Sequence, residues 1–483
     1  MNSPGLSRLA CAGCGTSPPA GEPYPFRCPR AGSGDDVDHV VVRVLDLDRL
    51  QFPSGGSPHP FLRYRTLLHS YHTARSGGLA DADFVRFVED LDARVAAVDG
   101  RGMRLTPFAG ATRLVERLGL GPGGGLRVKD ETGGVAGSHK ARHLFGLALH
   151  LEVAERLGRT SRGESDRRGL VIASCGNAAL AAATIARAAG RPLTAFIPAD
   201  ANVRIVERLG ELGTRTVVCE RSAERPARDP GGDPCVLAFR RALDRGALPF
   251  CCQGNENGLT VEGGSTLAYE MVSALAPGER SPDRLFIQVG GGALASACVQ
   301  GLRETLGLGA LAALPRFHAV QTEGAQPLRR AYLRVRAGVL ARLGLPPAAD
   351  RTAPADDETF AESIRPYASG TEVQAELAYA RAHRSEFMWP WESTPRSIAH
   401  GILDDETYDW HAVVTGMIES GGYPLTVSED RLAEARDLAR STTAIAVDAT
   451  GSAGLAGFLE LRAQELHRPG ETVGVLFTGA ERQ

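Results

Sequence analysis

Two lysines are the residues with the clearest capacity for chemistry. The chain has 54 lysine and arginine residues, and Lys129 and Lys140 are the only lysines among them. An arginine side chain stays protonated in proteins, whereas a lysine amine can become neutral and act as a nucleophile or a base. A bias towards arginine explains why lysine is rare, but not why both lysines lie within one short stretch, 128–142. We therefore expect amine chemistry in this stretch.

A run of three glycines is a second candidate for function. Gly290, Gly291 and Gly292 follow the apolar run 285–289 and precede a helical pattern that begins with Ala293 and Leu294. Backbone N–H groups of such a loop, at the start of a helix, favour an anion such as a phosphate. The loop lacks the G-x-G-x-x-G spacing of dinucleotide sites, so a single phosphate is the expected ligand.

Further polar positions lie at the ends of predicted strands. The last apolar run, 473–477, ends at Thr478, with Thr450 and Ser452 as weaker candidates nearby in the sequence. Ligands in open α/β sheets bind at the carboxyl ends of strands, so these positions are expected to join Lys140 in one site. The apolar run 169–174 is followed by a small-residue loop, made of Ser174, Cys175, Gly176, Asn177 and Ala178.

Strand and helix patterns alternate around these candidates. Strands are predicted at 126–129, 169–174, 193–198, 214–219, 285–289, 317–322, 444–447 and 473–477, and helices at 81–98, 141–157, 203–212, 267–275, 432–440 and 454–466. This alternation predicts an α/β fold with parallel sheets and crossover helices.

We divide the chain into four consecutive parts. A leader at 1–52 is followed by an N-terminal arm and the start of the domain that carries Lys140 at 53–165, a small α/β domain at 166–275 and a large α/β domain at 276–483. The large domain contains an insertion, 331–395, whose aromatic cluster at 387–391 is expected at the rim of the site or at a subunit contact, or as an ordinary core patch.

The leader contains Cys11, Cys14 and Cys28, which have the spacing of three corners of a zinc ribbon. A structural zinc site takes four nitrogen or sulfur ligands, and no fourth cysteine follows Cys28 closely. His39, or an aspartate at 35, 36 or 38, is the available substitute. We adopt the interpretation without a metal, in which the leader has a strand at 40–45 but is otherwise loose, and is dispensable for cofactor binding.

Composition excludes several classes of protein. The chain has 483 residues, 43% hydrophobic and 23% charged, with a net charge of −3. The absence of a basic surplus argues against nucleic-acid binding, and no apolar run has the length of a membrane span. Nine scattered cysteines do not form a disulfide pattern, and no secretory signal is recognisable at the start of the sequence. We therefore expect a cytoplasmic protein with no nucleic-acid or membrane partner.

Several ordered motifs resemble those of the fold-type-II pyridoxal-phosphate enzymes, most of all threonine synthase and the related dehydratases. The stretch 137–142, Gly-Ser-His-Lys-Ala-Arg, resembles the family's S-x-K-x-R motif with its Schiff-base lysine. The stretch 174–178 resembles the asparagine loop S-x-G-N, and 290–294 resembles the phosphate loop. Glu262-Gly263 with 266–270 resembles E-G-x-x-T-x-A-x-E, and 397–402 resembles T-I-A-x-x-I. The resemblance covers roughly residues 104–480, although His139 before the lysine is more similar to tryptophan synthase β chains.

The resemblance implies a fold, a cofactor and roles. It implies two open, mostly parallel sheets with flanking helices, and pyridoxal 5'-phosphate in the cleft between the domains of an expected homodimer. Lys140 would carry the cofactor and remove the α-proton of the substrate, and the backbone of Gly290, Gly291, Gly292, Ala293 and Leu294 would hold the phosphate. Asn177 and Thr478 would contact the ring, and Ser174, Cys175, Gly176 and Ala178 would bind the carboxylate of a small amino-acid substrate.

The implied activity is a lyase or replacement reaction. It would remove or replace the β or γ substituent of a small hydroxylated or O-activated amino acid, as threonine synthase or threonine/serine dehydratases do. Alternatives are a β-replacement synthase of the cysteine, cysteate or tryptophan type, a nucleotide-binding oxidoreductase, and a non-catalytic protein that keeps the fold. The oxidoreductase leaves the two lysines and Asn177 unexplained.

Overall fold

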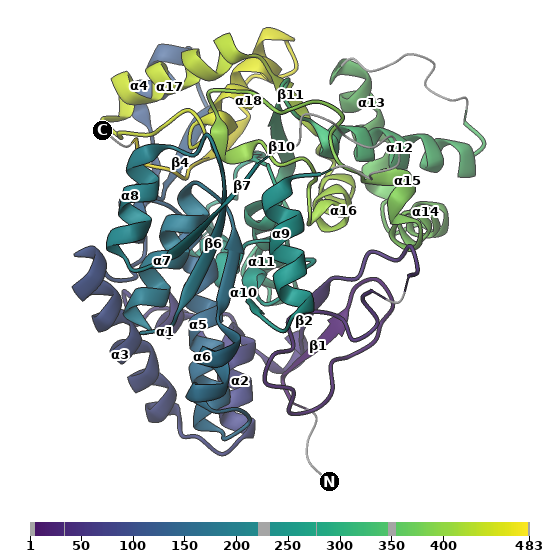
Figure 1. Ribbon diagram of the computed structural model, residues 1–483. Helices are drawn as coiled ribbons and strands as arrows, with labels where there is room; N and C mark the ends of the chain where they lie inside the picture. The colour runs from purple at the N-terminus through teal and green to yellow at the C-terminus, as the bar shows by residue number, and fades with distance from the viewer. Residues whose placement is uncertain (1–4, 33, 221–231, 277, 346–353, 482–483) are drawn as a thin grey trace. The chain divides into compact units, whose positions relative to one another are not determined.

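The computed structural model describes residues 5–32, 34–220, 232–276, 278–345 and 354–481 (Figure 1). The chain forms two compact units, and each of them combines segments that are distant in the sequence. The first unit contains Met1–Ser33, His39–Leu105 and Gly134–Tyr269, and the second contains Gly34–Asp38, Thr106–Gly133 and Glu270–Gln483.

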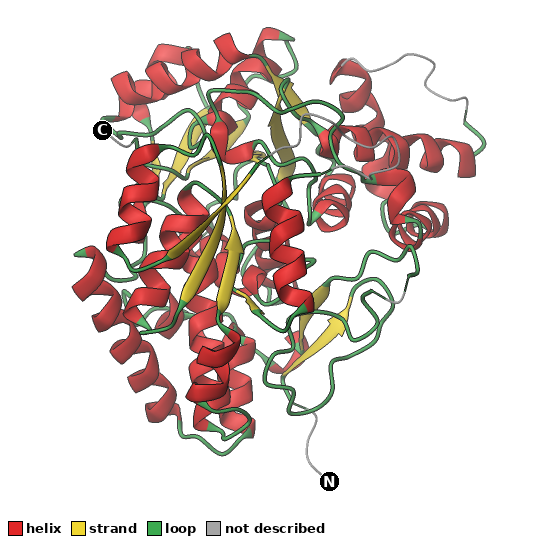
Figure 2. Ribbon diagram, in the orientation of Figure 1, coloured by secondary structure: helices red, strands yellow, loops and turns green. Residues whose placement is uncertain are grey.

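The first unit is built on a four-stranded parallel sheet in the order β7-β6-β5-β8. Figure 2 shows the strands in yellow with red helices beside them. Its strands are β5 (Leu170–Ala173), β6 (Leu193–Pro198), β7 (Arg215–Cys219) and β8 (Leu248–Pro249). The helices assigned to this unit are α1 (Pro60–Arg63), α2 (His69–Ser76), α3 (Asp81–Asp99), α5 (Lys140–Arg156), α6 (Arg162–Arg168), α7 (Asn177–Ala188), α8 (Val203–Glu211), α9 (Pro234–Asp244) and α10 (Thr260–Ser273), whose last turn counts with the second unit.

Helix α5 is held by a close crossing with α10. Its side chains are buried over most of its length, because apolar residues cover nearly its whole circumference. At the crossing, a Cβ atom on Gly263 would lie 2.0 Å from the carbonyl oxygen of Arg142, and a Cβ on Gly146 would lie 3.3 Å from the Cα of Gly263. Arg142 also donates from its guanidinium to the Thr266 hydroxyl at 3.1 Å. The glycine of the Glu262-Gly263 motif thus fixes the helix that begins at Lys140.

The leader is packed and not loose, which corrects one expectation. Strands β1 (Ser7–Cys11) and β2 (Val41–Leu45) form an antiparallel pair, and the second of these was predicted. The Tyr24 hydroxyl hydrogen-bonds to Thr160 Oγ1 at 2.7 Å, and the carbonyl of the buried Phe26 accepts from the Gly258 N–H at 2.9 Å. The Gly- and Pro-rich composition of the leader predicted a loop and gave no indication that Tyr24 and Phe26 are packed against the rest of the unit.

Arg43 anchors β2 through a buried ion pair. Its guanidinium lies 3.4 Å from Glu262 Oε2 and donates to the Tyr269 hydroxyl at 2.8 Å. We expect Arg43→Met to lower the free energy of unfolding by about 2 kcal/mol, the range of hydrogen bonds to charged groups. Chemical denaturation of the two proteins measures the difference.

Arg49→Met is the matched control for Arg43→Met. Arg49 pairs with Asp46, but 48% of the arginine side chain is exposed, so its loss should change stability by less than about 1 kcal/mol. Equal effects of the two substitutions would contradict the structural role of Arg43.

The second unit is built on a six-stranded sheet in the order β11-β10-β9-β12-β4-β3. Every neighbouring pair is parallel except β3–β4. The strands are β3 (Phe108–Gly110), β4 (Gly125–Asp130), β9 (Arg284–Gln288), β10 (Arg316–Thr322), β11 (Leu425–Val427) and β12 (Thr472–Phe477). The prediction of two mostly parallel sheets is therefore confirmed.

The units differ from the four consecutive parts predicted. Strand β4 pairs with β12, so that Leu126 lies opposite Val473, and residues 106–133 therefore belong to the second unit. The chain then returns to the first unit at Gly134, before Lys140. Sequence order could not show this exchange, because pairing between distant strands depends on tertiary structure.

Helices cover the six-stranded sheet. Helix α18 packs across β9, β10, β11 and β12, while α17 packs on α18 and α4. Helices α11 and α16 pack on each other and against β9 and β10, respectively. The bounds are α4 (Thr112–Leu118), α11 (Ala293–Gly307), α12 (Pro327–Arg342), α13 (Pro354–Ile364), α14 (Thr371–Ala382), α15 (Arg384–Phe387), α16 (Trp410–Ser420), α17 (Glu429–Thr443) and α18 (Ala453–Ala463).

Two sequence expectations for this unit need correction or refinement. The strand predicted at 444–447 is wrong, because Ala444 ends α17 with φ +57° and Val447 forms only an isolated bridge to Ala480. The aromatic cluster at 387–391 is partly core, since Phe387 is buried and stacks on Trp410 at 5.8 Å. Trp389 instead lies under the Arg330 guanidinium at 3.6 Å.

No helix in the described part of the chain combines the length and the apolar character needed to cross a membrane.

Candidate active site

Lys140 is the first residue of α5 and is half-buried. It follows a 3-10 turn, Val135–Gly137, in which Ala136 has φ +53°. Among the residues that the structure describes, none forms a hydrogen bond or an ion pair with the Lys140 amine. The amine at the start of this helix is therefore open to a reacting group, as a nucleophile or base requires.

Two histidines accompany Lys140 in the first unit. The His139 ring contacts the His143 ring edge-on at 5.8 Å, and His143 donates from Nδ1 to the Thr260 carbonyl oxygen at 2.7 Å. Burial, followed by the charge of Lys140, lowers the pKa of His143 to about 3. His143 is therefore neutral at physiological pH and adds no positive charge beside the amine.

Lys129 has the opposite environment. Its side chain is completely buried in the second unit, where Nζ lies 2.5 Å from Glu270 Oε2 and 3.6 Å from Glu131 Oε1. It also donates to the carbonyl oxygen of Thr106 at 2.8 Å. Two carboxylates and a backbone carbonyl thus enclose the Lys129 amine. The structural role predicted for Lys129 therefore agrees with its contacts.

The small-residue loop lies at the carboxyl end of β5, as predicted. Ser174 follows the strand and its N–H donates to the Phe196 carbonyl at 3.2 Å, while the Gly176 N–H faces Ser174 Oγ at 3.4 Å. Asn177 is the first residue of α7. Helices α5 and α7 pack against each other, and the turn before Lys140 also packs on α7. The first unit thus brings Lys140 and the Asn177 loop to the N-terminal ends of two neighbouring helices.

The glycine loop joins β9 to α11 in the second unit. The Gly290 carbonyl accepts from the Thr407 hydroxyl at 3.0 Å, and the Gly291 carbonyl accepts from the Asp409 N–H at 3.0 Å. In a trans peptide the C=O and the following N–H point in opposite directions, so the N–H groups of Gly291 and Gly292 face away from 407–409. Gly292 has φ +97° and precedes α11, which has no side-chain cap.

The residues present fit a phosphate. A Cβ atom on Gly290 would lie 2.3 Å from Asp404 Oδ2, and one on Gly291 would lie 2.8 Å from the Tyr408 ring. Larger residues would push the loop off this support. The loop therefore offers outward N–H groups and an uncapped helix start, which together form an anion cradle.

Thr478 lies directly after β12 and is buried. Gln288, the last residue of β9, donates from Nε2 to Thr478 Oγ1 at 2.5 Å and to the Gly451 carbonyl at 2.9 Å. The Gln288 side chain thus connects Thr478, the residue predicted to contact the cofactor ring, to β9, the strand that leads into the glycine loop.

The two weaker hydroxyl candidates have structural contacts. Thr450 Oγ1 accepts from the Gly401 N–H at 3.0 Å, and Ser452 Oγ donates to the Asp448 carbonyl at 2.9 Å. These bonds stabilise the entry to α18, which agrees with the packing role expected for both residues.

Three residues were not among the sequence candidates. Ser138 Oγ is buried without a hydrogen-bond partner in the described part of the chain, two residues before Lys140. A buried hydroxyl of this kind fits a ligand atom that completes the site. Gln288 and Asp404 contact Thr478 and the glycine loop, respectively. The S-x-K motif signals Ser138, but no local pattern signals the other two.

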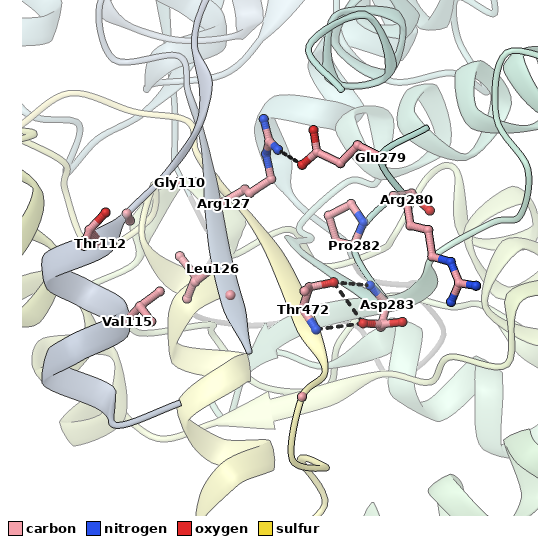
Figure 3. A pocket seen from close by; sticks show the side chains of 14 residues that line it. Gly110, Thr112, Val115, Leu126, Arg127, Glu279, Arg280, Pro282, Asp283 and Thr472 are labelled. Carbon is pink, nitrogen blue, oxygen red and sulfur yellow. Dashed lines mark hydrogen bonds and ion pairs between the residues drawn. The ribbon is translucent and has the colours of Figure 1, made fainter. Parts of the chain in front are cut away.

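A surface pocket in the second unit is lined by other residues (Figure 3). It is lined at the amino ends of β4 and β12, where Thr472 hydrogen-bonds to Asp283 and Arg127 pairs with Glu279. The predicted ligand positions follow the carboxyl ends of the strands. None of the predicted site residues lines this pocket.

Sequence comparison places the chain among known proteins. The family model described as "Pyridoxal-phosphate dependent enzyme" matches residues 102–479. The chain is 29% identical to a threonine synthase of Synechocystis sp. over 224 residues, 46% of this chain and 51% of the relative, so it spans about half of that relative's length. It is 26% identical to a threonine synthase of Methanosarcina acetivorans over 375 residues, 77% of this chain and 74% of the relative.

Comparison with solved structures agrees with the fold. Maize serine racemase superposes with a TM-score of 0.53 at 17% identity, covering 83% of this chain and 95% of the racemase. The two mostly parallel sheets are those of fold type II, and the cofactor is pyridoxal phosphate. The resemblance drawn from the motifs is thereby confirmed, and the chain belongs to the family of pyridoxal-phosphate dependent enzymes.

Proposed function

We propose that this protein eliminates or replaces the β or γ substituent of a small hydroxylated or O-activated amino acid, using pyridoxal phosphate attached to Lys140. The observation that carries the proposal is the contrast between the two lysines. Lys129 is enclosed by Glu131 and Glu270, whereas Lys140 stands at the start of α5 without an ion pair among the described residues. The threonine synthases among the relatives support this class of reaction.

The residues of the chain have separate tasks in this proposal. When bound, the cofactor withdraws electrons from the α-carbon of the substrate. The Lys140 amine would hold the cofactor and, once free, would accept the α-proton of the substrate. N–H groups of the glycine loop hold the phosphate, and the 174–178 loop binds the substrate carboxylate.

Thr478 is proposed to set how strongly the cofactor ring withdraws electrons from the substrate. A hydroxyl donates a hydrogen bond to the ring nitrogen but carries no charge to keep that nitrogen protonated. A cofactor held in this way would be a weaker electron sink, which would disfavour reactions that leave charge on it for long. Loss of a β leaving group would consume the α-carbon electron pair directly, whereas loss of a γ leaving group would first require removal of a proton from the β carbon. Gln288 donates to Thr478 Oγ1 and so holds this hydroxyl at the end of β12.

A product screen tests the proposal. Serine, threonine, O-phosphohomoserine and O-activated serines are incubated with the cofactor-loaded protein, with and without a nucleophile such as sulfide. We expect a keto acid with ammonia, or a replaced amino acid, from at least one of them. Yellow protein that reacts with borohydride yet turns over no amino acid would favour the non-catalytic alternative.

The role of Thr478 gives a separate prediction. Thr478→Asp should protonate the ring nitrogen and increase racemisation or transamination relative to elimination. Chiral chromatography and keto-acid analysis of the same reaction give the ratio. Thr450→Asp serves as a control, because Thr450 bonds to the Gly401 N–H. An unchanged ratio in cofactor-loaded Thr478→Asp would show that Thr478 is not the ring partner.

A further inference from the structure

Four side chains that can bind a metal meet in the leader. Cys11, Cys14, Cys28 and His39 place their ligand atoms within 4.8 Å of one another. Cys11, Cys28 and His39 are buried, and Cys14 is half-buried. The sequence left the fourth position open between His39 and three aspartates, and the structure brings His39 to it.

Local structure explains how the four residues meet. The chain turns tightly after β1, where the Cys11 N–H donates to the Thr16 carbonyl at 2.8 Å and the Gly15 N–H donates to the Cys11 carbonyl at 2.9 Å. This turn brings Cys14 back beside Cys11. The pairing of β1 with β2 sets Cys11 opposite Val41, so His39 lies just before the paired strand.

The distances fit a tetrahedral metal. The sulfur atoms of Cys14 and Cys28 are 3.6 Å apart, and Cys11 Sγ is 3.4 Å from His39 Nδ1. Zn–S bonds of about 2.3 Å and Zn–N bonds of about 2.05 Å at tetrahedral angles give S···S near 3.8 Å and S···N near 3.6 Å. A disulfide needs sulfurs only about 2.05 Å apart, so the spacing matches shared coordination instead.

A backbone donor supports a thiolate at Cys28. The Arg30 N–H donates to Cys28 Sγ at 3.4 Å. Metal-binding cysteines are deprotonated, and hydrogen bonds to their sulfurs stabilise and orient them.

We propose that Cys11, Cys14, Cys28 and His39 bind one zinc ion as a structural site. Three sulfurs and one imidazole nitrogen are a ligand set that zinc prefers, and four protein ligands leave no position for a substrate. The ion would close the leader around β1 and β2 and so hold Arg43 of β2 at Glu262. This proposal is independent of the reaction catalysed.

Metal analysis of the full chain tests the site. The protein is stripped with a chelator under reducing conditions, reloaded with zinc alone, desalted and analysed by mass spectrometry of the metal. We expect one zinc per chain in the unaltered protein, and loss of that zinc from His39→Ala under the same chelator challenge. Cys219→Ser is the matched control and should keep the zinc, because Cys219 lies in β7 outside the cluster.

Cobalt reloading keeps the test valid if His39→Ala fails to fold. A site with three sulfurs and one nitrogen gives tetrahedral ligand-field bands, and His39→Cys should retain the metal and strengthen the sulfur-to-cobalt charge-transfer absorption. Unaltered protein that takes up neither metal would overturn the proposal. Equal zinc in His39→Ala, or an unchanged cobalt spectrum in His39→Cys, would overturn His39 as the fourth ligand.

Discussion

Replacing Lys140 with arginine is expected to reduce turnover by at least about 10³-fold, within the range that positioned proton transfer contributes. Arginine keeps a positive charge at the start of α5, but its guanidinium can neither attach the cofactor covalently nor accept a proton. Turnover of whichever amino acid proves active in the product screen gives the measurement.

Stability distinguishes a chemical from a structural role for Lys140. Its amine has no ion pair in the described part of the chain, so the thermal midpoint of Lys140→Arg, measured without cofactor, should match that of the unaltered protein. Borohydride reduction of the unaltered enzyme, followed by digestion, should place the pyridoxyl label on Lys140. A label on Lys129 would falsify the assignment.

Replacing Lys129 with methionine is expected to cost about 3–5 kcal/mol of stability, the usual penalty for removing one partner of a buried ion pair. The substitution leaves Glu131 and Glu270 buried without the cation between them, both being at most 4% exposed. Chemical denaturation measures the loss, and the variant that remains folded should still bind cofactor covalently.

Two further variants separate charge from packing at Lys129. Adding Glu270→Gln to Lys129→Met removes one uncompensated carboxylate and should recover part of the stability. Arg86→Met provides a surface comparison, because Arg86 is 67% exposed where it pairs with Asp83. If Lys129→Met keeps full stability but loses covalent cofactor, the roles of the two lysines must be exchanged.

The sequence predicts most of the candidate site residues of the second unit, because the patterns that identify them lie within a few neighbouring residues. Buried apolar runs such as 285–289 and 473–477 have few alternatives to a central parallel strand. The residues directly after such strands, Gly290 and Thr478, must then lie at the carboxyl edge of the sheet. Because a helical pattern begins directly after the three glycines, the sequence also predicts that the glycine loop binds an anion.

The parts that sequence did not predict depend on register and long-range pairing. Nothing local distinguishes His39 from Asp38 as a neighbour of Cys11; the pairing of β1 with β2 decides between them. The short strand β11 was missed, because its three residues are added to the sheet only by pairing with β10. The strand expected at 444–447 failed for the converse reason, since an apolar run without an adjacent partner strand stays irregular.

The environments of the two lysines make the chain unusually suited to amine-directed labelling. Lys129 is fully enclosed and ion-paired, so Lys140 is the single lysine that a reagent such as an activated ester can approach. Bound cofactor occupies that amine and protects it. The extent of acylation at Lys140 would therefore report the fraction of molecules that lack cofactor. In an enzyme with many surface lysines, acylation of those lysines would obscure this signal.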